Sequence, residues 1–239
     1  MLAAMLLWVA TVVSLSEAKS GEGYALIGVG GSTHGLNTYA GAIYAPMNSL
    51  WEEGPLLRVW ADGFEYTYYT DLPQESDARI QGLGYGLQVE AGWQVVGEWG
   101  RAALLPGIMW RDHKLIPSDP WSRLEEGQLG LSFTVDGDLV LSDWLGVLTD
   151  ASFVMGFDEY SVRARPYLHL GHGWKIGLEL GTDGGPDYDI VRAGAFTAGY
   201  ELPPMGLGRL FLGGAAGVEW ADDGEPMAPF VDANIGLAF

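Results

Sequence analysis

The sequence contains no cysteine among its 239 residues and has few basic residues. The missing cysteine excludes a disulfide framework and thiol chemistry. Only 12 lysine and arginine residues oppose 31 aspartate and glutamate residues, which gives a formal net charge of −19. This charge argues against nucleic acid as a partner, because the phosphate backbone binds basic surfaces.

The familiar catalytic and metal-binding motifs are also missing. The four histidines are His34, His113, His169 and His172. None stands in an H-E-x-x-H spacing, and the sequence has no G-x-S-x-G nucleophile elbow. Residues 181–189, GTDGGPDYD, hold three aspartates but lack the ligand order of an EF-hand loop, so a turn is predicted there. No catalytic residue, metal or cofactor is expected.

Long hydrophobic runs are absent apart from one at the N-terminus. Residues 1–13 are almost wholly apolar, and Ser16 and Ala18 are small residues at the positions that a signal peptidase requires. The run is shorter than the ~20 residues of a membrane-spanning helix. The sequence therefore predicts a signal peptide over residues 1–18 and a single domain over residues 19–239.

The last residues of the chain, 229–239, alternate in polarity with a period of two. One face holds Val231, Ala233, Ile235, Leu237 and Phe239, and the other holds Asp232, Asn234, Gly236 and Ala238. This is the pattern of a β-strand, and a terminal aromatic residue is typical of the closing strand of a bacterial outer-membrane barrel. An edge strand of a soluble β-sandwich is the alternative.

Short alternating runs separated by Gly, Pro, Asp and Asn fill the rest of the chain, and no helical period exceeds two turns. We count about twelve runs, with ten to fourteen within the uncertainty of the boundaries. They are residues 24–30, 39–46, 56–66, 80–94, 100–111, 124–133, 139–153, 160–170, 174–180, 188–200, 209–220 and 229–239. The prediction is an all-β fold, a transmembrane antiparallel β-barrel in the bacterial outer membrane.

The run 80–94 alternates most clearly, with large apolar residues on one face and glycine, glutamine or glutamate on the other. Its length fits a tilted strand of ~9–11 residues that crosses the membrane. Asp136-Gly137 and Gly171-His172-Gly173 are predicted as hairpin turns. Pro106 and Pro166 fall inside predicted strands, where each removes a backbone donor.

Charged residues recur on the polar faces of these strands. A basic side chain that faces lipid near the midplane would cost roughly 2–4 kcal/mol, so these faces are predicted to line the lumen and to pair there. The candidate lumen network is Arg58, Asp62, Glu90, Arg163, Arg165, Lys175, Glu179, Asp189 and Arg192, with Asp232 on the closing strand. An ion-paired filling of the barrel and a substrate-binding or conducting lumen are both open.

Several segments resemble the cellulose biosynthesis protein BcsS family. They are TYAGAIYAP (38–46), LLRVWADGFEYTY (56–68), EEGQLGLSF (125–133), EYSVRARPYLHL (159–170) and ELGTDGGPDYDIVRAGAF (179–196). The resemblance extends over about residues 24–200. The positions that match its most specific motif are Arg163, Arg165, Asp187, Tyr188, Asp189 and Arg192.

The resemblance implies a non-catalytic accessory of cellulose production or secretion at the outer membrane. Implied partners are outer-membrane lipid, the cellulose synthase or export machinery, and glucan. Trp51 and Trp121, aromatic residues of predicted loops, are candidates for stacking on glucan.

Two alternatives belong to other functional classes. One is a lipid-modifying barrel enzyme that uses His169 with Ser161 or Ser152, although the spacing gives this reading no support. The other is a narrow porin, because about twelve strands lie between the filled eight-stranded barrels and the wide channels of roughly sixteen to eighteen strands.

Overall fold

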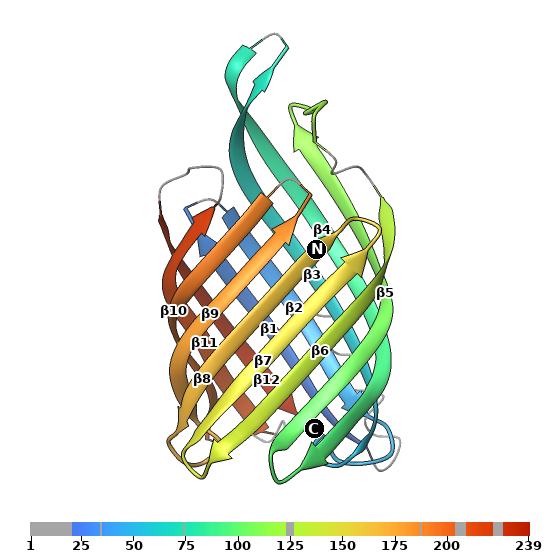
Figure 1. The fold of residues 1–239 in the computed structure, drawn as a ribbon, viewed down its shortest axis with the longest axis vertical. Coiled ribbons are helices and arrows are strands. Elements are labelled where there is room, and N and C mark those ends of the chain that lie inside the picture. The colour runs from blue at the N-terminus through green and yellow to red at the C-terminus, as the bar shows by residue number, and fades with distance from the viewer. Residues whose placement is uncertain are drawn as a thin grey trace.

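Twelve antiparallel strands form one closed barrel in the computed structural model of the chain (Figure 1). The structure describes residues 21–33, 35–73, 75–122, 127–186, 188–203, 209–221 and 227–239. The predicted signal peptide, His34 and Asp187 lie outside the described residues. Within the described part of the chain, no helix is long and apolar enough to cross a membrane.

The strands follow one another around the barrel in chain order. They are β1 (Glu22–Ser32), β2 (Gly35–Ala45), β3 (Gly54–Leu72), β4 (Glu75–Gly97), β5 (Gly100–Ile116), β6 (Gln128–Ser142), β7 (Leu145–Met155), β8 (Glu159–His169), β9 (Lys175–Gly185), β10 (Tyr188–Glu201), β11 (Arg209–Ala221) and β12 (Ala228–Ala238). This confirms the predicted all-β barrel of twelve strands and excludes the soluble sandwich.

The first and last strands close the barrel. Tyr24 of β1 pairs with Ala238 of β12, and the pairing continues to Ser32 and Phe230. Next to the pair Tyr24↔Ala238, the backbone groups of Gly23 and Phe239 exchange two hydrogen bonds of 2.9 and 3.0 Å. Closure leaves no strand edge unpaired, which is the condition for a sheet in a membrane. We call the end that holds Gly23 and Phe239 the periplasmic end, in keeping with outer-membrane barrels.

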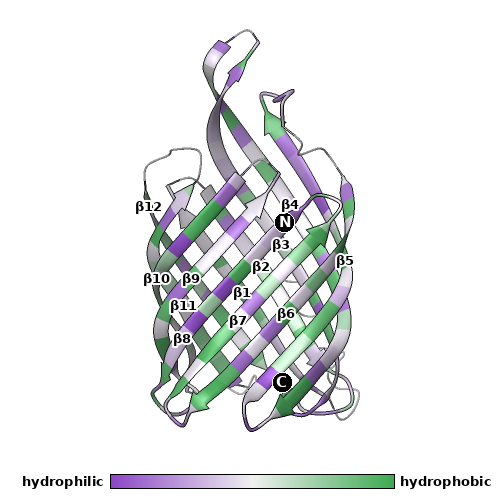
Figure 2. Cartoon of the chain, viewed as in Figure 1, coloured by the Kyte–Doolittle hydropathy of each residue, from purple (hydrophilic) through white to green (hydrophobic). Residues whose placement is uncertain are grey.

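The predicted alternation of β4 is present in the structure. Its large apolar side chains point outward, and Leu87 and Trp93 are 42% and 54% exposed. Its polar side chains Gln88, Glu90 and Gln94 point inward and are buried. Figure 2 shows the same interleaving of hydrophobic and hydrophilic residues along neighbouring strands. The outer surface can therefore face lipid, while the inner surface is polar.

Aromatic residues stand on the outer face near both rims. At the periplasmic end, Trp99 and Trp144 lie in the tight turns that precede β5 and β7, and both are exposed. Toward the other end, Tyr85 of β4 and Trp110 of β5 form an edge-on pair with ring centroids 5.3 Å apart. Amphipathic rings in these positions form the interfacial girdles of a membrane barrel.

The β3–β4 hairpin extends far beyond the extracellular rim of the barrel (Figure 1). β3 has 19 residues and β4 has 23, whereas ~9–11 residues suffice to cross a membrane. The pairing of β2 with β3 ends at Tyr66, and that of β5 with β4 ends at Gln81. Beyond those residues, the two strands of the hairpin pair only with each other in the described structure.

One of the two predicted hairpin turns is wrong. Asp136 and Gly137 lie in the middle of β6 and pair with Asp150 and Thr149 of β7. The real turn lies between β6 and β7, so the predicted run 139–153 spans a reversal of the chain. A Gly following an Asp is a common turn signal, but pairing on both sides overrides it here. The turn at Gly171 is confirmed, and residues 171–173 all have positive φ.

Both prolines lie inside strands, as predicted, and each interrupts one ladder. The pairing of β4 with β5 breaks between Glu90↔Gly107 and Trp93↔Leu104, beside Pro106. The pairing of β8 with β9 breaks between Ala164↔Leu180 and Tyr167↔Gly177, beside Pro166. On the other side of each proline-containing strand, the pairing of β5 with β6 and of β7 with β8 continues without a break. A missing N–H donor on one side of the strand accounts for this pattern.

Candidate functional site

A first group of polar contacts crosses the interior from β3. The Nε of Arg58 lies 2.7 Å from Oε2 of Glu90 on β4, and its Nη1 lies 3.8 Å from Oδ2 of Asp150 on β7. The hydroxyl of Thr134 on β6 donates to the other oxygen of Glu90 at 2.8 Å. β3 and β7 are not neighbours in the barrel, so these contacts span part of the lumen.

A second group lies nearer the extracellular end and centres on Arg111 of β5. Its two terminal nitrogens lie 2.8 Å from Glu159 on β8 and 3.4 Å from Asp62 on β3. His113 lies beside this pair, with its Nε2 4.0 Å from Glu159. The guanidinium of Arg111 is also 5.1 Å from the centroid of the Phe64 ring, which adds a cation–π contact.

A third group lies toward the periplasmic end. The ammonium of Lys175 on β9 pairs with one carboxylate oxygen of Asp138 on β6. The hydroxyl of Tyr167 on β8 donates to the other oxygen at 2.7 Å. Asp138 is buried, and each of its two oxygens has a donor, which compensates for the loss of water. We refer to these three groups, around Arg58, Arg111 and Lys175, as the interior braces.

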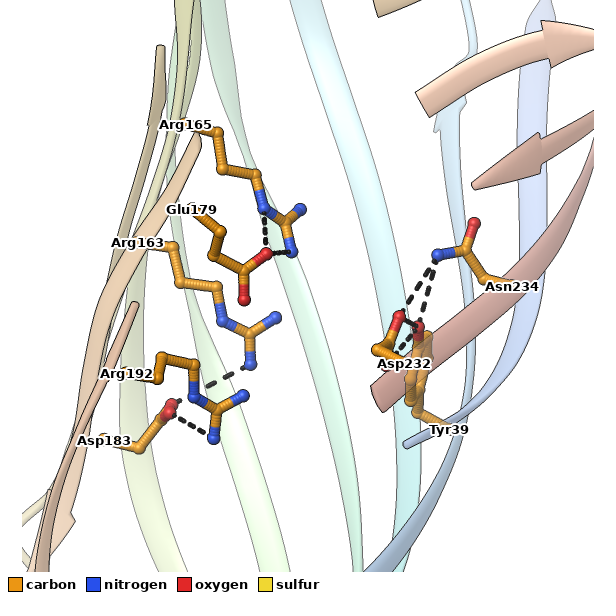
Figure 3. Close-up of polar contacts among 8 residues, drawn as sticks. All are labelled: Tyr39, Arg163, Arg165, Glu179, Asp183, Arg192, Asp232 and Asn234. Atoms are coloured by element: carbon orange, nitrogen blue, oxygen red, sulfur yellow. Dashed lines mark hydrogen bonds and ion pairs between the residues drawn. The ribbon is translucent and has the colours of Figure 1, made fainter. Parts of the chain in front are cut away.

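The wall formed by β8, β9 and β10 carries a ladder of arginines and carboxylates (Figure 3). Arg165 donates to Glu179 through Nε at 2.7 Å. Nearer the extracellular end, Asp183 binds Arg192 at 2.9 Å and Arg163 at 3.9 Å. Every arginine of this ladder comes from a strand next to that of its acid partner, so the ladder lines the wall without crossing the lumen.

A second polar cluster, which contains no basic residue, lies across the interior from this ladder (Figure 3). The hydroxyl of Tyr39 on β2 donates to Asp232 on β12 at 2.8 Å, and the side-chain amide of Asn234 donates to the same carboxylate at 3.4 Å. The two sides of the barrel thus present different chemistry to the lumen: charged groups on one wall, and an aromatic residue with a hydrogen-bonded carboxylate on the other.

Most residues of the predicted lumen network point into the barrel. They are Arg58, Asp62, Glu90, Arg163, Arg165, Lys175, Glu179 and Arg192. They do not form a single site, because the structure distributes them over the braces and the wall ladder.

Asp189 is the exception, and its predicted position is wrong. It lies on the outer face near the extracellular rim, where it accepts a hydrogen bond from the hydroxyl of Tyr160 at 2.5 Å. Asp189 and Arg192 are an odd number of residues apart on β10, and an odd separation puts side chains on opposite faces of a strand. Val191, on the same face as Asp189, is 53% exposed.

Sequence reasoning missed several of the partners. These are Arg101, Arg111, Asp136, Asp138, Asp150, Glu159 and Asp183. Asp136 and Asp138 were missed because a turn was predicted at Asp136-Gly137, and Asp183 because residues 181–189 were predicted to form a turn. In the structure, Asp183 belongs to β9 and points inward toward Arg192. Strict alternation along β6 and β9 would have found all three.

The structure separates the residues of the lipid-enzyme alternative. His169 and Ser161 lie eight residues apart on β8, which is about 26 Å along an extended strand. Ser152 of β7 pairs directly with Ser161 and is equally distant from His169. Among the described residues, no group of three or more His, Asp or Glu side chains could hold a metal ion.

The two tryptophans proposed to contact glucan lie at opposite ends of the barrel. Trp51 lies in the periplasmic segment between β2 and β3, and Trp121 lies in the extracellular segment between β5 and β6. Both side chains are exposed, at 59% and 68%. The guanidinium of Arg101 lies 5.7 Å from the Trp51 ring. The pair cannot act as one binding surface.

A closed barrel of twelve strands with an apolar outer face, aromatic rims and a polar interior defines a bacterial outer-membrane β-barrel. More particularly, the chain belongs to the cellulose biosynthesis protein BcsS family, whose sequence model matches residues 27–234. It therefore has a role in cellulose biosynthesis, and membership implies association with the cellulose-synthesis machinery. No curated protein sequence matches the chain.

Solved structures support the fold. An outer membrane channel from Pseudomonas putida F1 is 10% identical, with 92% of this chain and 96% of that chain covered and a TM-score of 0.56. The KdgM porin is also 10% identical, with 90% and 99% covered and a TM-score of 0.50. A second KdgM porin structure, with the same scores, is a complex with disordered oligogalacturonate. Family and fold together favour a barrel without catalytic activity.

Proposed function

We propose that the protein is a non-catalytic accessory barrel of cellulose production whose interior is narrowed by ion pairs. The observation that carries the proposal is the set of interior braces between strands that are not neighbours. Arg58 contacts Asp150 across β4, β5 and β6, and Arg111 contacts Glu159 across β6 and β7. Side chains that meet across the lumen leave less room for a solute than side chains that lie along the wall.

Two further features support a role without catalysis. The histidine and serines that a lipid-modifying enzyme would use are far apart, as described above. The charged groups of the braces are paired with one another, as Lys175 is with Asp138. Paired groups of this kind hold a structure in place and offer no activated nucleophile.

Genetic complementation tests the role in cellulose production. Deletion of the gene should lower cellulose, measured as glucose released from the insoluble polysaccharide of washed cells by acid and cellulase. The wild-type chain should restore it, and so should His169→Ala, because the proposal gives His169 no chemical role. Loss of complementation by His169→Ala, or lipid hydrolysis by the purified protein, would contradict the non-catalytic proposal.

Planar-bilayer recording tests the narrowed interior. The wild-type barrel should give small current steps or none. Arg111→Ala combined with Glu159→Ala removes one brace and should give larger steps, because this contact then no longer crosses the lumen. Arg79→Ala, in the exposed part of the β3–β4 hairpin, is the matched charge control and should leave the steps unchanged. Large wild-type steps would instead support the porin alternative.

A further inference from the structure

The inward face of β3 carries four aromatic side chains, Trp60, Phe64, Tyr66 and Tyr68. The arginines of the interior braces lie over the two lower rings: Arg58 is 5.8 Å from the centroid of Trp60 and Arg111 is 5.1 Å from that of Phe64. The ring centroids of Phe64 and Tyr66 are 6.0 Å apart and those of Tyr66 and Tyr68 are 6.1 Å apart, with interplanar angles of 25° and 21°. Rings in successive inward positions of this strand are therefore nearly parallel, with the spacing that a two-residue repeat imposes.

Glycines of the neighbouring strands explain why the rings lie flat on the wall. A Cβ atom on Gly82 would lie 2.3 Å from Cζ of Tyr66, and one on Gly84 would lie 2.2 Å from Cζ of Phe64. Both glycines belong to the inward face of β4. Each ring therefore covers a backbone position that has no side chain. One face of the ring rests on the wall, and the ring is only partly buried.

Trp60 repeats this arrangement two inward positions lower, with Asp62 between it and Phe64. A Cβ atom on Gly41 of β2 would lie 2.2 Å from Cε3 of Trp60. The ring of Tyr39 lies beside it, with centroids 5.4 Å apart and an interplanar angle of 13°. The inner faces of β2 and β3 thus carry aromatic rings from the Tyr39 cluster to the extracellular hairpin, interrupted at Asp62, and the upper rings form an aromatic platform.

The upper end of this platform is linked to an exposed tryptophan. The hydroxyl of Tyr68 donates to one carboxylate oxygen of Asp119 at 2.7 Å, and the backbone N–H of Trp121 donates to the other at 2.9 Å. Asp119 therefore fixes the loop that carries Trp121 against the top of the platform. The Trp121 side chain is 68% exposed.

The charges of the interior favour a neutral ligand. The cations of the braces and of the wall ladder all have a carboxylate partner within 4.0 Å. A polyanion would have to break these pairs. A sugar ring is uncharged and needs no counter-ion. Its C–H face packs on the electron-rich face of an aromatic ring, while its hydroxyls bind polar groups at the edge.

We propose that Tyr66 and Tyr68, above the Arg111–Glu159 brace, form a binding platform for a single β-1,4-linked glucan chain at the extracellular mouth of the barrel. A β-1,4 chain is a flat, extended ribbon, and it matches a flat row of rings better than a coiled chain does. The inference depends on the proposed function, since the role in cellulose production brings such a chain to the barrel.

Titration calorimetry with cellohexaose on the purified, detergent-solubilised protein tests the platform. Tyr66→Leu should weaken binding about 3- to 10-fold, the typical contribution of one aromatic contact. Tyr69→Leu is the matched control and should bind like the wild type, because Tyr69 is on the outer face of the same hairpin and 58% exposed. Maltohexaose, a coiled α-linked chain of the same composition, should bind more weakly than cellohexaose.

A second variant alters the platform and keeps every aromatic group. Gly82→Ala places a methyl group where the Tyr66 ring now lies and should lift the ring from the wall. It should weaken cellohexaose binding while a band shift on heating shows that the barrel is folded. Tyr68→Leu serves the same purpose if either variant fails to fold.

Two results would overturn the platform. One is the absence of cellohexaose binding by the folded wild-type protein, and the other is an equal loss of binding in Tyr66→Leu and Tyr69→Leu. Either result would leave the proposed function standing if the wild-type gene still restored cellulose in the deletion strain. Failure of that complementation would instead remove the proposed function itself.

Discussion

At the scale of single residues, the buried acids show how a polar interior is stabilised. Glu90 is 2% exposed, and its oxygens contact Arg58, Thr134 and the side-chain amide of Gln88. A buried carboxylate without a cation is strongly unfavourable, whereas a fully satisfied one can be roughly neutral. The interior charges therefore depend on one another far more than surface charges do.

We expect Arg58→Met to lower the free energy of unfolding by about 3 kcal/mol, because it leaves Glu90 buried without its cation. Arg58→Met combined with Glu90→Gln should recover most of this loss, since a neutral amide needs no counter-charge. Urea unfolding of the folded barrel, followed by tryptophan fluorescence, measures both.

Arg79→Met provides the control for the loss of a positive charge, because Arg79 is exposed in the hairpin above the rim. It should change the free energy of unfolding by less than about 0.5 kcal/mol. If the double variant at Arg58 and Glu90 were as unstable as Arg58→Met alone, the ion pair would not be the source of the effect.

At the scale of elements, the glycines of β4 have a structural purpose that alternation alone does not reveal. The sequence shows only that glycine recurs on the polar face of residues 80–94. The structure shows that Gly82 and Gly84 lie beneath rings of β3 and that Gly86 lies beside the carboxylate of Asp62. Large side chains on one strand and glycines on the next are complementary, and together they form one wall of the barrel.

The extended β3–β4 hairpin should be dispensable for folding. Tyr69 and Arg79 are directly paired, so a two-residue Asn-Gly turn can replace residues 70–78. The shortened chain should still form a heat-modifiable barrel, because all pairings with β2 and β5 lie below this level.

This truncation leaves the aromatic platform in place, so the shortened protein should also bind cellohexaose. The matched control adds Asn-Gly to the same hairpin and keeps residues 70–78. Loss of the heat-stable band in the truncated chain alone would show that the hairpin tip contributes to folding of the barrel.

At the scale of the whole molecule, closure between β1 and β12 decides whether the chain can reside in a membrane. A sheet with two open edges would leave backbone groups unsatisfied in lipid, and each such group costs several kcal/mol. The seam extends from Tyr24↔Ala238 to Ser32↔Phe230. The pairing between β1 and β12 is therefore required for a stable barrel in the membrane.

We expect the outer-membrane fraction to contain the protein as a band that migrates differently on a detergent gel before and after boiling. Removal of residues 228–239 deletes β12 and should abolish the shift, because β1 and β11 then become open edges. Phe239→Leu keeps the strand and should retain the shift. A soluble wild-type protein without a shift would contradict the membrane barrel.

The sequence by itself determined the fold class, the approximate number of strands and the faces of most of them. These follow from local rules: a period of two fixes the face of a side chain, and lipid on one side and water on the other select opposite residue types. The rule also holds where it was misapplied, since Asp189 lies on the face that strict alternation from Arg192 gives.

Only the tertiary structure decided which charges meet and where the aromatic rings lie. Arg111 contacts Glu159 because the curvature and tilt of the closed sheet bring β5 and β8 together across the lumen, and no sequence spacing encodes that distance. Likewise, Tyr66 covers Gly82 because of the register between β3 and β4. Local periodicity fixes which way a side chain points, whereas closure of the barrel fixes what it contacts.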